Sequence, residues 1–248
     1  HEASAGSDHP IDEMSRQWAL RAARRYLPAG SPVVLEVGSS SGFLLGDLQT
    51  AFPHAVLVGS DYLSGPLQRV AARVPGVPLL QFDLVQCPLP DACVDVAILL
   101  NVFEHIEDDG AAARQIARVL KPGGVAIVEV PAGPRLFDVY DEYLRHHRRY
   151  SAAGVRSLLI GAGLTICEQS HLGFLVYPSF VIVKRRNQQR DLSDPEVNRR
   201  IVEANITSTR TSRVLRACLR VEAWFGRYVS YPLGIRVVTV ARKPAGGR

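Results

Sequence analysis

Residues 33–42, Val-Val-Leu-Glu-Val-Gly-Ser-Ser-Ser-Gly, constrain the fold more than any other stretch of the chain. A short apolar run that carries one acid, Glu36, and ends at a glycine is typical of a buried parallel strand. Gly38 and Gly42 then predict a tight turn in which the backbone can approach a ligand closely. We expect a helix from about Phe43, so that its N-terminus lies beside the turn. The stretch predicts a strand, turn and helix that bind a nucleotide-like ligand.

The spacing around this turn narrows the class of ligand. A second apolar run covers residues 55–59, and Asp61 follows it, where a carboxylate can accept both hydroxyl hydrogens of a ribose. The turn reads Glu-x-Gly-x-x-x-Gly rather than the dinucleotide fingerprint Gly-x-Gly-x-x-Gly, and no Gly-Lys-Ser/Thr follows it. It carries three serines and no positive charge. These features indicate a ligand with a ribose and little or no phosphate.

Length and composition exclude several other classes of protein. The 248 residues suit one large domain or one domain with an added element, and 47% apolar residues are enough for a sizeable core. The net charge of +5 is too mild to indicate nucleic-acid binding by itself. The longest apolar stretch, residues 172–183, is interrupted by Pro178 and is shorter than the roughly 20 residues that span a bilayer.

Cysteine usage and the N-terminal sequence point to the cytoplasm. We see no signal peptide and expect a cytoplasmic protein. The cysteines show no Cys-x-x-Cys spacing, so we expect reduced, buried thiols. They are Cys87, Cys93, Cys167 and Cys218.

Apolar patterns alternate along the chain in the way that βαβ units do. A first helix is expected over residues 11–27, with Ile11, Met14, Trp18, Ala22 and Tyr26 on one face. The pattern then predicts strands at 33–37, 55–59, 78–82, 94–99, 125–130 and 164–169. It predicts helices at 43–51, 65–73, 109–119 and 152–162, with a helix stop and tight turn at 121–124. Such a series favours a parallel sheet with right-handed crossovers, and residues 235–241 read as one last strand.

Between the sixth strand and the last one lies a long excursion, residues 173–234. We expect a short helix over 174–186 with a break at Pro178, and a longer, interrupted helix over 194–229. Val214, Cys218, Val221 and Phe225 fall on one face of the longer helix. Residues 184–220 hold ten basic and four acidic side chains, a net charge of +6. One interpretation is a solvated helix that packs its apolar side on the domain. The other is a lid over the substrate pocket, or a surface for an anionic or lipid-like substrate.

Further segments follow one pattern. Asp83 ends the sequence Leu-Gln-Phe-Asp after the third strand, and Asp95 opens a fourth strand that continues to Asn101 and on to Glu104-His105. Lys-Pro-Gly-Gly at 121–124 and an apolar strand that ends at Pro131 come next. In this order the segments resemble the class I S-adenosylmethionine-dependent methyltransferases. The small-molecule branch, which includes the ubiquinone-biosynthesis O-methyltransferases, is the most similar, and the resemblance covers residues 33–169.

The resemblance implies an architecture and a division of the chain. The implied fold is α/β and Rossmann-like, with a mainly parallel seven-stranded sheet and helices on both faces. Residues 1–30 are then an N-terminal tail and lid helix, and residues 31–172 the cofactor-binding core. Residues 173–234 are the basic helical insert, and residues 235–248 the last strand and C-terminal tail.

It also implies S-adenosylmethionine as cofactor and a role for each matching residue. Glu36 closes the turn near the methionine end, and Asp61 binds the ribose. Tyr62 lies against the adenine, and Asp83 accepts a hydrogen bond from its amino group. Asn101 faces the sulfonium and the methyl group. The implied cofactor-binding residues are Glu36, Gly38, Ser39, Ser40, Gly42, Asp61, Tyr62, Asp83, Leu84, Asn101 and Val102. Many members have a third glycine where Ser40 stands.

Two histidine regions compete for the role of a base that removes the acceptor's proton. His105 follows the fourth strand, where the alternative is a cap for the next helix. The second region, residues 140–151, is dense in His, Arg and Tyr and borders the acceptor pocket in this family. There we favour His146 as base or orienting residue, with Tyr140, His147, Arg149 and Tyr150 as substrate-binding residues. The alternative is that the arginines and Tyr150 brace the loop.

The implied activity is methyl transfer to a small acceptor, a natural product, sugar or quinone-like molecule, at oxygen. Transfer to nitrogen or carbon is the alternative. Some relatives hold a metal near the Glu-His pair with an acid three residues earlier; Asn101 stands there, so we expect no metal. A nicotinamide oxidoreductase leaves the later motifs unexplained. A nucleic-acid methyltransferase of exocyclic amines usually carries Asn/Asp-Pro-Pro-Tyr/Phe, which is absent, so we expect no nucleic-acid partner. A non-catalytic cofactor-binding protein is the rival from another class.

Overall fold

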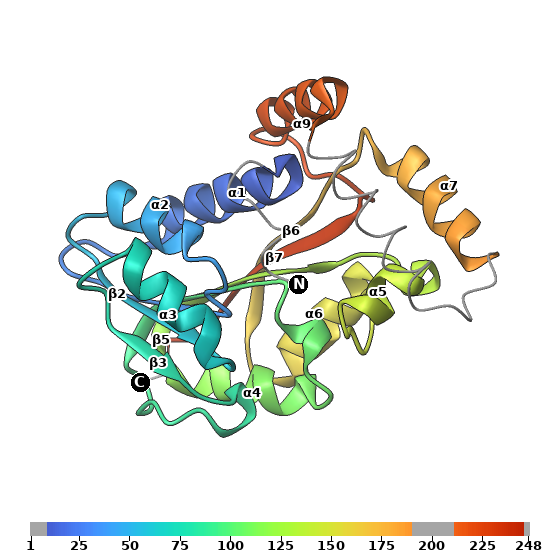
Figure 1. Ribbon diagram of the computed structural model, residues 1–248. Coiled ribbons are helices and arrows are strands. Elements are labelled where there is room, and N and C mark those ends of the chain that lie inside the picture. The colour runs from blue at the N-terminus through green and yellow to red at the C-terminus, as the bar shows by residue number, and fades with distance from the viewer. Residues whose placement is uncertain (1–8, 190–210, 246–248) are drawn as a thin grey trace.

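The computed structural model describes residues 9–189 and 211–245 and forms one seven-stranded sheet with helices on both faces (Figure 1). The strand order is β3-β2-β1-β4-β5-β7-β6. Strands β1 to β5 pair in parallel, whereas β7 runs antiparallel to both of its neighbours. The strands are β1 (Val33–Val37), β2 (Val56–Asp61), β3 (Leu79–Gln81), β4 (Val94–Leu100), β5 (Leu120–Pro131), β6 (Thr165–Leu172) and β7 (Arg236–Arg242).

Helices cover the two faces of the sheet because side chains alternate along each buried strand. In β1, Val34 packs towards one face, and Leu35 and Val37 pack towards the other. Helices α1 (Pro10–Tyr26), α2 (Phe43–Ala51) and α3 (Ser64–Arg73) cover the first face. Helices α4 (Asp109–Val119) and α6 (Ala152–Gly161) cover the second. The chain also forms α5 (Val139–Tyr143), α7 (Tyr177–Gln188), α9 (Arg213–Phe225) and one-turn 3-10 helices at Leu84–Gln86, Phe103–His105 and Pro134–Leu136.

The predicted fold class is confirmed, and most predicted elements lie within two or three residues of the observed ones. The prediction of a tight turn at residues 121–124 is wrong in one respect. β5 begins at Leu120, which pairs with Val94, so the Lys-Pro-Gly-Gly sequence lies inside the strand at an irregularity of the β4–β5 register. Gly123 has a positive φ of 84°, which bends the strand without ending it.

The helices of the insert depart further from the prediction. Pro178 lies in the first turn of α7, where its missing N–H costs nothing, so it starts the helix rather than breaking it. Residues 190–210, the first part of the predicted long helix, lie outside the described residues. The described part, α9, packs on α1 through Leu215 and Leu219 (Figure 1). Its predicted apolar face is wrong as a packing face, because Val214, Val221 and Phe225 are exposed.

The structure also bears on the predicted thiols and on membrane-spanning segments. All four cysteines are free, but only Cys87 is buried and Cys167 is exposed, which corrects the prediction of buried thiols. No helix within residues 9–189 and 211–245 is long and apolar enough to cross a membrane.

Candidate functional site

The turn after β1 lies at the carboxyl ends of the parallel strands, where open α/β sheets bind ligands. Gly38 and Gly42 have φ values of 75° and 73°, in the left-handed region that favours glycine. A Cβ atom on Gly38 would lie 2.9 Å from Cγ2 of Val102, so the turn leaves no room for a side chain there. The structure thus provides the close backbone approach that the sequence predicts.

Asp61 ties this turn to the end of β2. The backbone N–H of Ser40 donates to Oδ2 of Asp61 at 3.0 Å, and that of Leu63 donates to Oδ1 at 3.0 Å. Each carboxylate oxygen has a second lone pair, so both remain able to accept a ribose hydroxyl. Ser40 has a φ of 45°, a left-handed conformation that glycine would adopt without strain. Ser39 is buried, and its Oγ accepts from the N–H of Ser60, which joins β1 to β2.

Glu36 is a buried acid with one unpartnered carboxylate oxygen. Its Oε2 has no hydrogen-bond partner among the described residues. Burial raises the pKa of Glu36 to about 8, and the hydrogen bond from Ser39 opposes this only in part. An ammonium group beside Glu36 would supply the missing donor and charge. The amino-acid end of S-adenosylmethionine carries such a group, and its contact with Glu36 stays a prediction.

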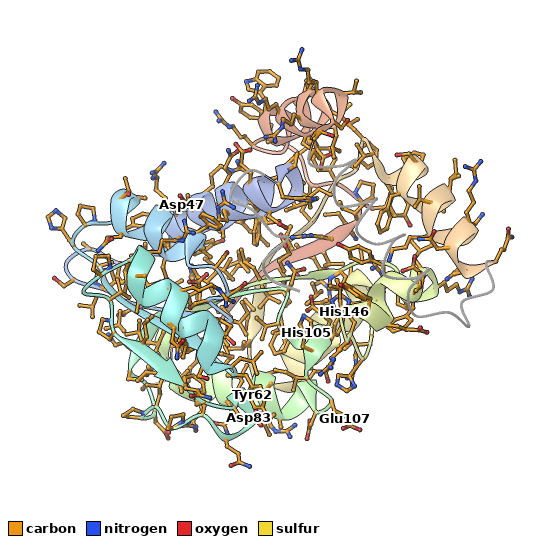
Figure 2. All side chains as sticks on the ribbon, viewed as in Figure 1. Asp47, Tyr62, Asp83, His105, Glu107 and His146 are labelled. Atoms are coloured by element: carbon orange, nitrogen blue, oxygen red, sulfur yellow. The ribbon has the colours of Figure 1, made fainter. Side chains whose placement is uncertain are left out.

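Three residues form the predicted adenine end of the site. Tyr62 is exposed just beyond β2, and Asp83 lies just beyond β3, which pairs with β2 at the last residue of each strand; both side chains are labelled in Figure 2. Oδ1 of Asp83 accepts the backbone N–H of Val85 at 2.9 Å and begins the 3-10 turn that buries Leu84. The arrangement places an exposed ring and an acceptor at the ends of two neighbouring strands. The roles themselves stay predictions.

Asn101 is held by a chain of buried charges that the sequence analysis missed. It has a φ of 54°, and its Nδ2 donates to Oε1 of Glu129 at 3.1 Å. Glu129 is fully buried in β5 and also accepts from Arg236 of β7. Arg236 in turn donates to Asp12 at 2.8 Å. The N-terminal helix α1 is thereby connected to the residue expected to face the methyl group. The only sign of this network in the sequence is Glu129, a single acid inside the apolar run 126–130.

His146 and Asp141 form the second charged centre. Nδ1 of His146 lies 2.9 Å from Oδ1 of Asp141, and both side chains are almost fully buried. Burial opposes ionisation of Asp141, but the His146 hydrogen bond and the cations Arg149 and Lys184 hold its pKa well below the ordinary range. An ionised Asp141 fixes the proton of His146 on Nδ1, which leaves Nε2 as the acceptor.

Helix α7 of the insert supplies a counter-ion to this centre. Nζ of Lys184 lies 2.6 Å from Oδ1 of Asp138 and 2.8 Å from Oδ2 of Asp141. Asn187, one turn further along, donates to Asp138 at 2.9 Å. These contacts attach α7 to α5 beside His146. They support the interpretation of this part of the insert as a cover for the acceptor side, although the domain assignment itself stays a prediction.

His105 lies beside His146, as Figure 2 shows, with their ring centroids 4.7 Å apart. Desolvation and the neighbouring His146 ring lower the pKa of His105, so it is neutral at pH 7. Both carboxylate oxygens of Glu104 are buried without a partner among the described residues, and burial raises its pKa to about 8. Glu104, His105 and His146 each offer a ligand atom within 4.8 Å of the others. This Glu–His–His group has the donors that a metal ion requires, and the absence of a metal stays a prediction.

Of the four predicted substrate-binding residues, Arg149 and Tyr150 are hydrogen-bonded within the fold. Tyr140 lies near Arg236 and Lys184, and His147 is exposed. Arg149 donates to the carbonyl of Ala132 and to Asp141. Tyr150 is buried, and its hydroxyl lies 2.7 Å from Oδ2 of Asp109. The last two side chains are engaged within the fold, which favours the bracing alternative for them.

Comparison with known proteins shows which proteins this fold is similar to. Residues 35–128 match the methyltransferase domain family. A probable S-adenosylmethionine-dependent methyltransferase of Mycolicibacterium smegmatis is 34% identical over 138 residues, which are 54% of this chain and 52% of that protein. A ubiquinone/menaquinone biosynthesis C-methyltransferase of Syntrophotalea carbinolica is 29% identical over 54% of this chain and 59% of that protein. The matched region spans little more than half the length of these relatives.

Solved structures extend the likeness to the whole fold. A putative sarcosine dimethylglycine methyltransferase from Galdieria sulphuraria superposes with a TM-score of 0.64 at 17% identity, over 98% of this chain and 93% of that one. At this identity the likeness concerns the fold alone. With the matching domain and relatives, it shows a class I methyltransferase fold and a similarity to S-adenosylmethionine-dependent methyltransferases.

Proposed function

We propose that this protein transfers the methyl group of S-adenosylmethionine to a hydroxyl group of a small acceptor, with His146 as the base. The cofactor supplies a methyl group activated by the sulfonium to which it is bound. The residues of this chain then bind and align the two reactants, exclude water and accept one proton. The observation that carries the proposal is the buried Asp141–His146 pair at the carboxyl side of the sheet.

The cofactor half of the proposal depends on the turn after β1. Glu36 binds the amino group, Asp61 the ribose hydroxyls, and Tyr62 and Asp83 the adenine. Asn101, held by Glu129, directly follows β4 and precedes the Glu104-His105 pair in the chain. A buried carboxyl with an unpartnered oxygen and a turn that excludes any side chain support this assignment.

The acceptor half depends on the tautomer of His146. Because ionised Asp141 accepts a hydrogen bond from Nδ1–H, Nε2 takes the proton of the acceptor hydroxyl as the oxygen attacks the methyl carbon and the bond from that carbon to sulfur breaks. Asp141 acts through His146 and is a positioning residue. The relative from Syntrophotalea carbinolica is a quinone C-methyltransferase by name, which makes a hydroxylated ring a suitable first acceptor to test. Transfer to carbon is the second candidate on the same ground.

The test measures S-adenosylhomocysteine formation with the purified full chain, S-adenosylmethionine and a panel of quinols, phenols and sugars. We expect turnover with at least one acceptor. His146→Asn should lower kcat by roughly 100-fold or more, the usual contribution of a general base. His54→Asn, an exposed histidine outside the site, is the matched control and should keep full activity.

Cofactor binding, measured by calorimetry, separates the two halves of the proposal. His146→Asn should bind S-adenosylmethionine as the wild type does, and Asp61→Ala should lose binding. If His146→Asn turns over with an unchanged kcat and pH profile, the base assignment is wrong and alignment alone carries catalysis. If the protein binds the cofactor and methylates nothing in the panel, the non-catalytic alternative gains.

A further inference from the structure

Helix α9 is apolar on two opposite sides. Its inner side packs against α1 and β7 through Leu219, and Glu222 accepts the backbone N–H groups of Gly173 and Leu175. Its outer side carries apolar residues that the inner packing does not use. Val214 is 74% exposed, Val221 50%, Trp224 54% and Phe225 50%. Such exposure of large apolar side chains on one surface indicates an interaction site.

The outer side continues beyond the end of the helix. Tyr228 is 75% exposed, and Val229 is 51% exposed. The Trp224 ring contacts the Phe225 and Tyr228 rings, with centroids 4.7 Å and 5.9 Å away. We call these six residues, Val214, Val221, Trp224, Phe225, Tyr228 and Val229, the α9 outer face.

The charged side chains of α9 and of the residues that follow it are nearly all positive. Residues 211–230 contain four arginines and a single acid, Glu222, which is buried and hydrogen-bonded to the backbone. Arg213, Arg220 and Arg227 are exposed. A two-fold contact between copies of this face would bring arginines of both copies together, which like-charge repulsion disfavours. The complementary partner is anionic.

We propose that the α9 outer face docks the protein on the surface of an anionic lipid bilayer. Trp and Tyr side chains favour the headgroup region, where their rings are half in the apolar phase and half in water. A helix with apolar and aromatic residues between arginines binds in the plane of the interface, and each arginine adds attraction to anionic lipids. From its charge alone, the insert was expected to be a solvated packing helix, a lid, or a surface for an anionic or lipid-like substrate. The proposed contact with lipid rests instead on this apolar face and the arginines beside it.

The test is co-sedimentation of the full chain with vesicles of phosphatidylcholine alone and of phosphatidylcholine mixed with phosphatidylglycerol. We expect binding to the mixed vesicles only, with a blue shift of tryptophan fluorescence and weakening at high salt. The double variant Trp224→Ser/Phe225→Ser should bind about tenfold more weakly or worse. Arg220→Gln and Arg227→Gln should each lower binding about fivefold.

Two variants on the opposite side of the sheet are matched controls. Ile160→Ser removes an apolar side chain of α6 that is 53% exposed, and Arg114→Gln removes an exposed arginine of α4. Both should bind as the wild type does. The proposal is overturned if the wild type binds neither kind of vesicle, or if the double variant binds as Ile160→Ser does. It is also overturned if the wild type is a dimer without vesicles that the double variant separates into monomers. None of these outcomes depends on methyl transfer, so the proposal stands or falls independently of the proposed function.

Discussion

Replacement of Glu36 by Gln tests how burial of a carboxyl with one unpartnered oxygen affects the stability of the fold. Glu36 is 5% exposed, its Oε2 lacks a hydrogen bond among the described residues, and burial raises its pKa to about 8 from an ordinary 4.5. In the unfolded chain the same carboxyl is ionised above about pH 5. Between these two values the folded state therefore holds one proton more than the unfolded state.

The sign of the effect follows from this proton difference. A group whose pKa is raised on folding destabilises the fold as pH rises through the window between the two pKa values. Each such group lowers the free energy of unfolding by up to roughly 1.4 kcal/mol per pH unit. Glu104 has the same raised pKa of about 8 and acts in the same direction. His105 has a lowered pKa and acts in the opposite direction, but only below the pKa of an unfolded histidine, about 6.5. The window from about pH 6.5 to about pH 8 therefore isolates the two glutamates.

The assay is urea unfolding at several pH values across this window, without cofactor. The wild type should lose roughly 1.5 kcal/mol more than Glu36→Gln between about pH 6.5 and about pH 8. Glu104→Gln is the matched control, since it removes a second buried acid away from the turn and should show a similar difference.

Cofactor titration at the same pH values then tells the two acids apart. An ammonium group beside Glu36 favours the carboxylate, so affinity for S-adenosylmethionine should rise with pH in the wild type and in Glu104→Gln. It should be flat in Glu36→Gln. Parallel unfolding curves for the wild type and Glu36→Gln would refute the raised pKa. A normal cofactor affinity with the same pH slope in Glu36→Gln would instead refute the contact with the amino group.

Three further changes test other parts of the site. Gly38→Ala should weaken cofactor binding about tenfold or more, because the new Cβ meets Val102 at 2.9 Å. Gly30→Ala, with an equally positive φ but open space around it, controls for backbone strain alone and should bind normally, as calorimetry would show. Lys184→Met leaves two buried aspartates without their shared cation and should lower the free energy of unfolding by roughly 3 kcal/mol in urea, whereas exposed Arg185→Met should change it little. Chelation with EDTA should leave S-adenosylhomocysteine formation unchanged, because Glu104, the acid of the Glu–His–His group, is mostly protonated at pH 7. A loss of activity that Mg²⁺, Mn²⁺ or Zn²⁺ restores would show that the group binds a metal.

The turn and the neighbouring acid on which the proposed cofactor site depends could be predicted from the sequence, because the contacts that form them are local. A strand that ends in Gly38 must turn, and a positive φ at Gly42 places the next helix beside that turn. Asp61 then lies opposite because β1 and β2 are parallel neighbours whose carboxyl ends meet at one edge. Each step involves residues close in sequence or in adjacent strands, so the periodicity of the chain contains the information.

Other features depend on contacts that periodicity does not reveal. The Lys-Pro-Gly-Gly sequence has turn chemistry, yet pairing of Leu120 with Val94 extends β5 through it. The face of α9 that packs inward is decided by Leu219 against Met14 and Val238, whereas the spacing of Val214, Val221 and Phe225 predicts the opposite face. A helix with two apolar sides gives the hydrophobic pattern no means to choose between them.

The proposed acceptor site is built around Asp141, which connects His146 to helix α7 of the insert. Asp141 accepts from His146, Arg149 and Lys184, and only Lys184 belongs to the insert. Because the pKa of Asp141 depends on all three donors, the orientation of His146 is coupled to the position of α7. A substitution in α7 that moves Lys184 would leave Asp141 with one cation fewer and weaken its hold on the Nδ1 proton. We therefore expect variation of the insert to alter the pH dependence of catalysis together with the choice of acceptor. The turn at Gly38 and Asp61 shares none of the hydrogen bonds of Asp141, so we expect cofactor binding to stay unchanged.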